Sequence, residues 1–337
     1  SGQSRVKNSG LYGETQDLNR ELSSKELDEL YPQVRGELEA KGQITGDQEI
    51  PVISSTFNGR ELSYNKLAIF EIAGEMSADL FRWQALDVQL AAKELNINNN
   101  EILSLDINTE GELVNTYVVT DKAKAEIALK GQVDIPKNNS GWQGTILKAD
   151  INSDYYDNWK LDKPVPLQIK DRKLLLETIC WHSNRQASLC ASVNQQQTSL
   201  LASIQMNEVP LTLVEHWLPE DLTLDGSADA TAKVEYQFPD QLIAELNVSL
   251  HEGSINYPML SGESDHRFYT AGKLQLDLDN DGLKATSELT MRNGDHFTGT
   301  ISMPGYQPLT VTEQEQPLTA SVRVNAKDLG LIEVFFP

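Results

Sequence analysis

The most constraining feature of this 337-residue chain is a recurrent alternation of apolar and polar side chains. From Ala123 to Ile135 every second position is apolar or glycine, and Lys, Glu, Gln and Asp fill most positions between them. The same period of two recurs within residues 103–107, 226–238, 244–250, 274–278 and 318–326. This period is typical of strands with one dry and one wet face, as antiparallel sheets have. The sequence therefore predicts an all-β antiparallel fold and excludes a doubly wound one.

Turn residues separate these alternating segments. Asn58-Gly59, Glu110-Gly111, Asp281-Gly282 and Asn293-Gly294 are pairs that favour tight hairpin turns. We expect each pair to join two neighbouring strands, which predicts a long meander.

A few segments break the alternation and suggest a division of the chain. Residues 1–24 are predicted to be a flexible lead-in. Residues 25–205 form a first β-segment that begins with a short helix, and residues 206–326 form a second one with a short helix near 211–218. Residues 327–337 begin a further repeat helix.

The helical segments belong to an internal repeat. Residues 204–207 match residues 322–325, Trp217-Leu218 matches Phe335-Phe336, and Pro219 matches Pro337, all at an offset of 118 positions. Repetition of this kind favours an elongated architecture. Chance similarity between two helices that end at proline is the alternative.

Charge narrows the possible partners. The chain has 28 Lys and Arg residues against 50 Asp and Glu residues, a formal charge of -22. A charge of this sign repels phosphate backbones, so no nucleic-acid partner is expected. No apolar stretch approaches the length of about 20 residues that a membrane helix needs. The Ser-Gly start without Met indicates a piece of a longer protein.

No catalytic or metal site is expected from the motifs, and no cofactor. The chain is therefore not expected to be an enzyme. The histidines are scattered, and the nucleophile, P-loop and dinucleotide motifs are missing. Asp277, Asp279, Asp281-Gly282 and Glu288 match the spacing of an EF-hand loop. Because the flanking residues alternate as strands, we expect a hairpin turn at Asp281-Gly282 instead.

The two cysteines, Cys180 and Cys190, are separated by nine residues, which fits two strands joined by a polar turn. A disulfide in an oxidising compartment is the preferred reading, and two buried free thiols are the alternative.

Several motifs together resemble the TamB family. They are the repeated cassette, residues 141–146 (GWQGTI) leading to residues 158–161 (NWKL) with Pro164 and Pro166, and the cysteine pair before Leu218-Pro219. TamB proteins are inner-membrane subunits of the translocation and assembly module of diderm bacteria, within the AsmA-like or bridge-like lipid transfer group. The resemblance covers the chain from about Leu27 onward, and residues 1–24 match nothing in it.

The resemblance implies a sheet curled into a U-shaped groove, or β-taco, with an apolar interior. It implies a periplasmic part of an inner-membrane-anchored protein that moves phospholipid between the membranes or assists outer-membrane protein and autotransporter assembly. The implied partners are an outer-membrane barrel protein (TamA-like), phospholipid and outer-membrane protein clients. A β-rich extracellular adhesin or stalk with a closed core is the alternative. The residues that would line the groove are those on the dry face of the predicted strands: Leu103, Leu105, Ile107, Ile127, Leu129, Val133, Ala228, Ala230, Ala232, Val234, Leu246, Val248, Leu274, Leu276, Leu278, Val322 and Val324.

Overall fold

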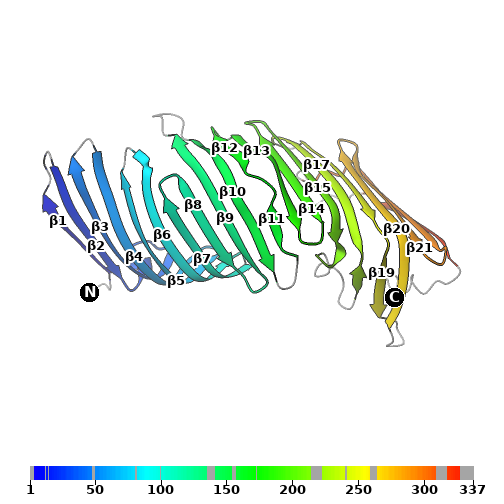
Figure 1. Ribbon diagram of the computed structural model, residues 1–337, viewed down its shortest axis with the longest axis horizontal. Helices are drawn as coiled ribbons and strands as arrows, with labels where there is room; N and C mark the ends of the chain where they lie inside the picture. Colours follow the sequence, from blue (N-terminus) through cyan, green and yellow to red (C-terminus); the bar gives the residue numbers. More distant parts are fainter. Residues whose placement is uncertain are drawn as a thin grey trace. The chain divides into compact units, whose positions relative to one another are not determined.

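The computed structural model describes residues 4–11, 13, 15–47, 50–79, 82–98, 100–134, 141–153, 157–171, 173–213, 222–239, 241–258, 264–308 and 317–326. The chain folds into two compact units, Ser1–Lys170 and Asp171–Pro337. Both are built from antiparallel strands, as the alternation predicted, and Figure 1 shows the strands of each unit side by side.

The first unit contains twelve of the described strands and one 3-10 turn, η1. Their bounds are β1 Ser4–Leu11, β2 Thr15–Ser24, η1 Leu27–Glu29, β3 Val34–Asp47, β4 Ile50–Tyr64, β5 Leu67–Asp79, β6 Arg82–Ile97, β7 Asn100–Glu110, β8 Leu113–Val119, β9 Ala123–Asp134, β10 Gly141–Ser153, β11 Trp159–Leu161 and β12 Val165–Lys170. Each strand from β1 to β10 pairs with the next one along the chain, and β10 also pairs with β11 and β12.

The second unit is also a meander, with one short excursion. Its described strands are β13 Lys173–Ser183, β14 Ser188–Gln195, β15 Ser199–Pro210, β16 Thr223–Asp225, β17 Ser227–Gln237, β18 Gln241–Leu250, β19 Gly253–Pro258, β20 Ser264–Asp279, β21 Gly282–Met291, β22 His296–Pro304 and β23 Thr319–Asn325. The main order is β13-β14-β15-β17-β18-β20-β21-β22-β23. The first half of β20 instead pairs with β19, which pairs with β16.

Residues 1–24 are not a flexible lead-in, because β1 and β2 form a regular hairpin whose pairing runs from Ser4 opposite Ser24 to Leu11 opposite Asp17. The β2 positions opposite the apolar side of β3 hold Arg20 and Ser24 as well as Leu18 and Leu22. These polar residues concealed the period of two.

The predicted helices are largely wrong where the structure describes them. The first is only the 3-10 turn η1, and residues 211–213 form a second 3-10 turn. Each turn buries one leucine, Leu27 or Leu211, which are 7% and 8% exposed. Residues 214–218 and 327–337 lie outside the described residues.

The predicted segment boundary at residues 205/206 does not coincide with the boundary between the compact units. Residue 205 lies in the middle of β15, which pairs along its length with β14 and β17. A strand with partners on both sides cannot be an interdomain linker.

Three of the four predicted hairpin turns are confirmed, and Asn58-Gly59 is wrong. Both residues lie within β4, with Gly59 opposite Leu38 of β3 and Ile72 of β5. A Cβ at Gly59 would lie 2.8 Å from Leu62 Cδ1 and 3.0 Å from Ile72 Cγ2. The glycine therefore serves close packing on the apolar face of β4.

Some strands shift their alternation by one residue at an irregular position. Glu61 in β4 and Glu94 in β6 have positive φ angles, 51° and 49°. Ala92 and Leu95 flank Glu94 three positions apart, and they are 2% and 4% exposed. A left-handed residue between them lets both side chains remain on the buried side.

The largest buried cluster described lies in the second unit. Leu211, Ala228, Tyr269 and Met291 form it, with Leu222 and Leu224 among the half-buried residues around it. The Tyr269 side chain is 0% exposed, and its hydroxyl donates a hydrogen bond of 2.8 Å to the Asp225 carbonyl oxygen. Burial, together with the charge of Asp225, raises the pKa of Tyr269 to about 12.

Candidate functional site

The candidate site in the second unit is a continuous apolar face that crosses eight strands. Residues that lie directly opposite one another on neighbouring strands project from the same face of a sheet. The ladder from β14 to β23 therefore defines two adjacent rows. Row 1 is Ala191, Ile204, Ala232, Leu246, Leu276, Ala285, Ile301 and Ala320. Row 2 is Leu189, Met206, Ala230, Val248, Leu274, Ser287, Gly299 and Val322.

The opposite face of the same strands is polar. The row between rows 1 and 2 in sequence, on the other side of the sheet, is Cys190, Gln205, Thr231, Asn247, Gln275, Thr286, Thr300 and Ser321. Neighbouring side chains bond along it: Gln275 Nε2 donates to Asn247 Oδ1 at 3.1 Å, and the Thr300 and Ser321 hydroxyls lie 2.8 Å apart. The sheet is thus one-sided.

The first unit has an equivalent apolar face. Row 3 is Leu22, Ala40, Phe57, Gly74, Leu90, Ile107, Thr116, Ile127 and Ala149. Row 4 is Leu38, Gly59, Ile72, Ala92, Leu105, Val118, Ala125 and Ile151. Thr116 is the one hydroxyl residue in these two rows.

The rows contain both large and small residues. A Cβ at Gly74 would lie 2.7 Å from Phe57 Cζ, so the Phe57 ring covers Gly74. In the same way, Trp142 covers Gly131 and Gly144, where a Cβ would meet its ring at 2.4 Å and 2.6 Å. A neighbouring aromatic ring therefore fills the space above each of these glycines. Ala230 and Ala232 are half-buried.

The apolar faces are only partly covered. Ile204 and Ile301 of row 1 are 40% and 44% exposed, and Leu274 and Val322 of row 2 are 38% and 62% exposed. A closed sandwich would bury such side chains almost completely, because its core residues face a second sheet. The described residues leave these four side chains substantially accessible, and so the face is open.

Most of the predicted groove residues lie on these rows. Leu105, Ile107, Ile127, Ala230, Ala232, Leu246, Val248, Leu274, Leu276 and Val322 are members. Val234 pairs with Ala244, Ala244 pairs with Leu278, and Val324 pairs with Phe297. Leu129 pairs with Val114 and Ile146, and the backbone of Val133 pairs with Trp142. Ala228 and Leu278 lie on the face but are buried, at 8% and 6% exposure.

Leu103 is the predicted residue that the structure does not bring to the face. Its side chain is 47% exposed, and it lies between the pairs Lys93–Ser104 and Leu95–Ile102. Because the alternation shifts here, Ile102 faces Leu95, which is 4% exposed. The prediction assumed an unbroken period of two and therefore assigned Leu103, rather than Ile102, to the apolar face.

The sequence reasoning also missed Ile204 and Ile301, the two exposed isoleucines of row 1. Ile204 was noticed only as part of the repeat, and Ile301 lies in a segment rich in Gly, Thr and Ser. Phe297, Ile301 and Met303 all occupy odd-numbered positions of β22, and this alternation could have placed Ile301 on the apolar face.

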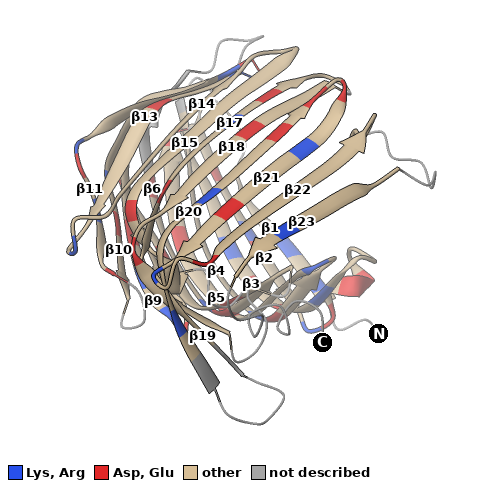
Figure 2. Ribbon diagram, turned by 90° about the vertical axis from the view of Figure 1, so that its right-hand side faces the viewer, with Lys and Arg blue, Asp and Glu red and all other residues tan. Residues whose placement is uncertain are grey.

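Charged residues are interspersed along the strands, as Figure 2 shows. Lys148 Nζ lies 2.6 Å from Glu126 Oε2, and this hydrogen bond is the largest cause that raises the pKa of Lys148. Two depressions of about 390 and 470 Å3 lie over β2–β7. The first is lined mainly by polar residues, and the second includes Phe57, Gly74, Leu90 and Ile107 of row 3.

The cysteines and the acidic motif have structural roles. Cys180 and Cys190 lie opposite each other on β13 and β14 and form a disulfide. The acidic motif forms the hairpin between β20 and β21, and Asp281 N–H donates to Asp279 Oδ1 at 2.8 Å. The prediction of a hairpin at this position is confirmed.

Comparison with known families agrees with this one-sided β-architecture. The family model described as TamB, N-terminal domain, matches residues 1–337. The chain belongs to the TamB family. Membership gives this TamB chain a role in the biogenesis of the cell envelope. No curated protein and no solved structure was found that matches it. Within the described residues, no helix is long and apolar enough to cross a membrane.

Proposed function

We propose that this TamB chain carries phospholipid along the open apolar faces of its two units, as part of transport between the inner and outer membranes. The observation that carries the proposal is the partial exposure of large side chains within continuous rows, above all Ile204, Leu274 and Ile301. The family supplies the envelope setting. The proposed role is that of a conduit and involves no enzymatic step.

The dimensions of row 1 suit an acyl chain. Neighbouring strands lie about 4.8 Å apart, so a row across eight strands has a contour of roughly 34 Å. The hydrocarbon core of a bilayer is about 30 Å thick, so one acyl chain extends over roughly 15 Å. A chain lying across the strands would therefore contact three or four of them, and the row could hold it at successive positions.

The energetics require continuity of this face. Each CH2 group left in water costs about 0.8 kcal/mol, so a gap of a few methylenes would be a substantial barrier. Row 1 has a hydrocarbon side chain at every position from Ala191 to Ala320. Small residues such as Ala232 and Ala285 leave room beside larger ones for a flexible chain.

Photo-crosslinking tests this proposal with a matched pair of positions. Leu276 lies in row 1, and Gln275 is its neighbour on the polar face of β20. A photoreactive amino acid at Leu276, or at Ile127 in the first unit, should crosslink phospholipid in cells, and the same group at Gln275 should not. Purified chain without bound phospholipid, together with equal labelling at both positions of β20, would refute the proposal.

A second candidate function is the handling of outer-membrane protein clients, in concert with an outer-membrane barrel partner of the TamA-like kind. Among the described strands, β1 pairs only with β2, and its Val6 and Leu11 are 53% and 76% exposed. An open strand edge can accept a client strand by β-augmentation. Crosslinks to unfolded barrel proteins concentrated at Val6 rather than at Leu276 would favour this role.

The proposed location is the periplasm, on a protein anchored in the inner membrane. Fractionation of cells that produce the full-length protein, followed by protease treatment of spheroplasts, tests this location. An extracellular adhesin with a closed core would instead bury Ile301, whose side chain is 44% exposed.

A further inference from the structure

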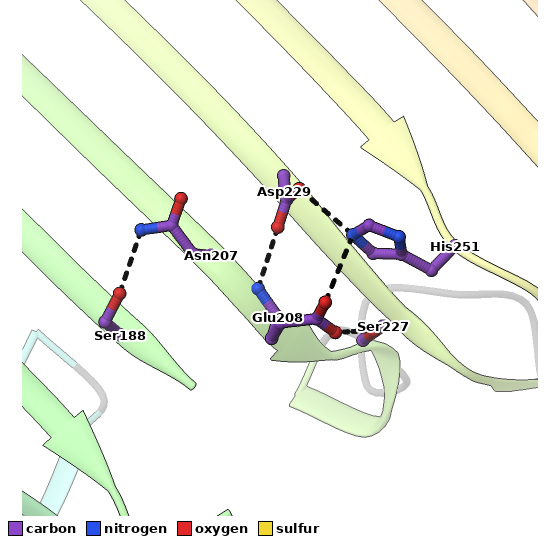
Figure 3. A network of polar contacts seen from close by, with 6 residues as sticks. All are labelled: Ser188, Asn207, Glu208, Ser227, Asp229 and His251. Atoms are coloured by element: carbon purple, nitrogen blue, oxygen red, sulfur yellow. Dashed lines mark hydrogen bonds and ion pairs between the residues drawn. The ribbon is translucent and has the colours of Figure 1, made fainter. Parts of the chain in front are cut away.

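A cluster of three potential metal ligands lies where β15, β17 and β18 come together in the second unit. Glu208 belongs to β15, Asp229 to β17, and His251 follows β18 directly. Their ligand atoms all lie within 4.8 Å of one another (Figure 3). His251 Nε2 is 3.0 Å from Asp229 Oδ2 and 3.7 Å from Glu208 Oε1.

The backbone conformation near the end of β15 brings these side chains together. Glu208 has a positive φ of 53°, and the pairing of β15 with β17 shifts between Met206 and Val209. The bulge directs the Glu208 side chain to the same side of the sheet as Asp229. Asp229 lies on the polar face, whereas its sequence neighbours Ala228 and Ala230 lie on the apolar face. The His251 amide is held by a hydrogen bond of 2.9 Å to the Ser227 carbonyl oxygen.

One oxygen of each carboxylate is already engaged, and the other points to the histidine. The Glu208 amide donates to Asp229 Oδ1 at 2.8 Å, and the Ser227 hydroxyl donates to Glu208 Oε2 at 2.8 Å. Asp229 Oδ2 and Glu208 Oε1 face His251 Nε2 (Figure 3). Hydrogen bonds that orient ligand carboxylates in this way are common around metal sites.

The third ligand atom lies inside the cluster. His251 Nε2 has almost no accessible surface, although the His251 side chain as a whole is 41% exposed, and it faces Asp229 Oδ2 at 3.0 Å without a well-aligned hydrogen bond among the described residues. A buried ring nitrogen that lacks a hydrogen bond is uncommon. A cation between the nitrogen and the two oxygens would satisfy it.

We propose that Glu208, Asp229 and His251 bind a divalent transition-metal ion, with Zn2+ as the best fit. In a tetrahedral site with ligand bonds of about 2.0–2.1 Å, neighbouring ligands lie about 3.3 Å apart, between the two distances measured here. The imidazole nitrogen favours Zn2+ over Ca2+ or Mg2+, which prefer oxygen ligands. Three protein ligands leave one position for water or for a group of a partner.

The site lies on the polar face, away from rows 1 and 2, so it acts independently of lipid binding. A bound ion would join the ends of three strands and hold the bulge of β15 in place. It would thus stabilise this end of the sheet.

Isothermal titration of the 337-residue chain, freed of affinity tag and stripped of metal with a chelator, tests the site. We expect one Zn2+ per chain and no comparable heat with Ca2+. His251→Ala and Asp229→Asn should each weaken binding at least about 10-fold, and Ser227→Ala about 10-fold. His266→Ala, a change at an exposed histidine of β20, is the matched control.

A second readout separates metal binding from a simple ion pair between His251 and Asp229. Co2+ bound in a tetrahedral site gives a strong visible absorption, which His251→Ala should abolish and His266→Ala should retain. Zn2+ should raise the unfolding temperature of the wild-type chain and leave that of His251→Ala unchanged. Absence of stoichiometric Zn2+ binding, or binding equal in wild type and His251→Ala, would overturn the proposal. Circular dichroism confirms that each variant is folded.

Discussion

Removal of the Tyr269 hydroxyl is expected to change both the stability and its dependence on pH. The side chain is 0% exposed, and its hydroxyl donates to the Asp225 carbonyl oxygen at 2.8 Å. In Tyr269→Phe this carbonyl oxygen loses its donor. A buried group left without its hydrogen bond costs about 1–3 kcal/mol, so we expect the free energy of unfolding at pH 7 to fall by about 1–2 kcal/mol.

At high pH the comparison changes in favour of the variant, because only the wild-type chain has an ionisable hydroxyl at position 269. The pKa of Tyr269 is raised from 10.0 to about 12 in the folded chain, first by burial and then by the charge of Asp225. Because the folded pKa lies above the unfolded one, this contribution to stability is complete below pH 10 and is lost as the pH rises toward 12. The loss is about 1.4 kcal/mol by pH 11 and about 2.3 kcal/mol at pH 12.

Urea unfolding of wild type and Tyr269→Phe at pH 7, 9, 10 and 11 measures both effects. All other ionisable groups are common to both proteins, so the difference between the two unfolding free energies isolates Tyr269. We expect the deficit of the variant to shrink above pH 10 and to be largely abolished by pH 11. A constant deficit from pH 7 to pH 11 would refute the assigned pKa shift, and no deficit at pH 7 would refute the role of the hydrogen bond.

Three other changes test the architecture. Gly74→Ala should lower the free energy of unfolding by about 1–3 kcal/mol, because its Cβ would lie 2.7 Å from Phe57 Cζ and 2.8 Å from the Gln89 carbonyl oxygen; an unaffected urea midpoint would contradict this packing. Replacing both Cys180 and Cys190 by serine should cost at most about 3 kcal/mol relative to the oxidised wild-type chain, and the reduced wild-type chain should be destabilised by the same amount. Ile301→Ser should cost less than the 2–5 kcal/mol of a fully buried site, since the side chain is 44% exposed, while phospholipid recovered with the purified chain decreases. A loss of the full buried value would indicate a covered face.

Within the sheet, the sequence determined which residues share a face. The period of two placed Ala230, Ala232, Leu246 and Leu276 on one side, and the ladder confirms that they are neighbours on successive strands. Local chemistry also determined the hairpin at Asp281-Gly282, because this pair favours a tight turn and lies between two alternating segments.

Only the tertiary structure decided where the alternation shifts and which distant residues meet. Ile102 takes the buried side in place of Leu103 because the alternation of burial in β7 changes by one residue between Ile102 and Leu105, and nothing local in the sequence marks that position. Glu208, Asp229 and His251 come together because a bulge in β15 lies beside the start of β17 and the end of β18, and the sequence does not mark that bulge. The openness of the face was likewise undetermined by the sequence, since an alternating strand has the same pattern whether its apolar side packs on a second sheet or remains accessible.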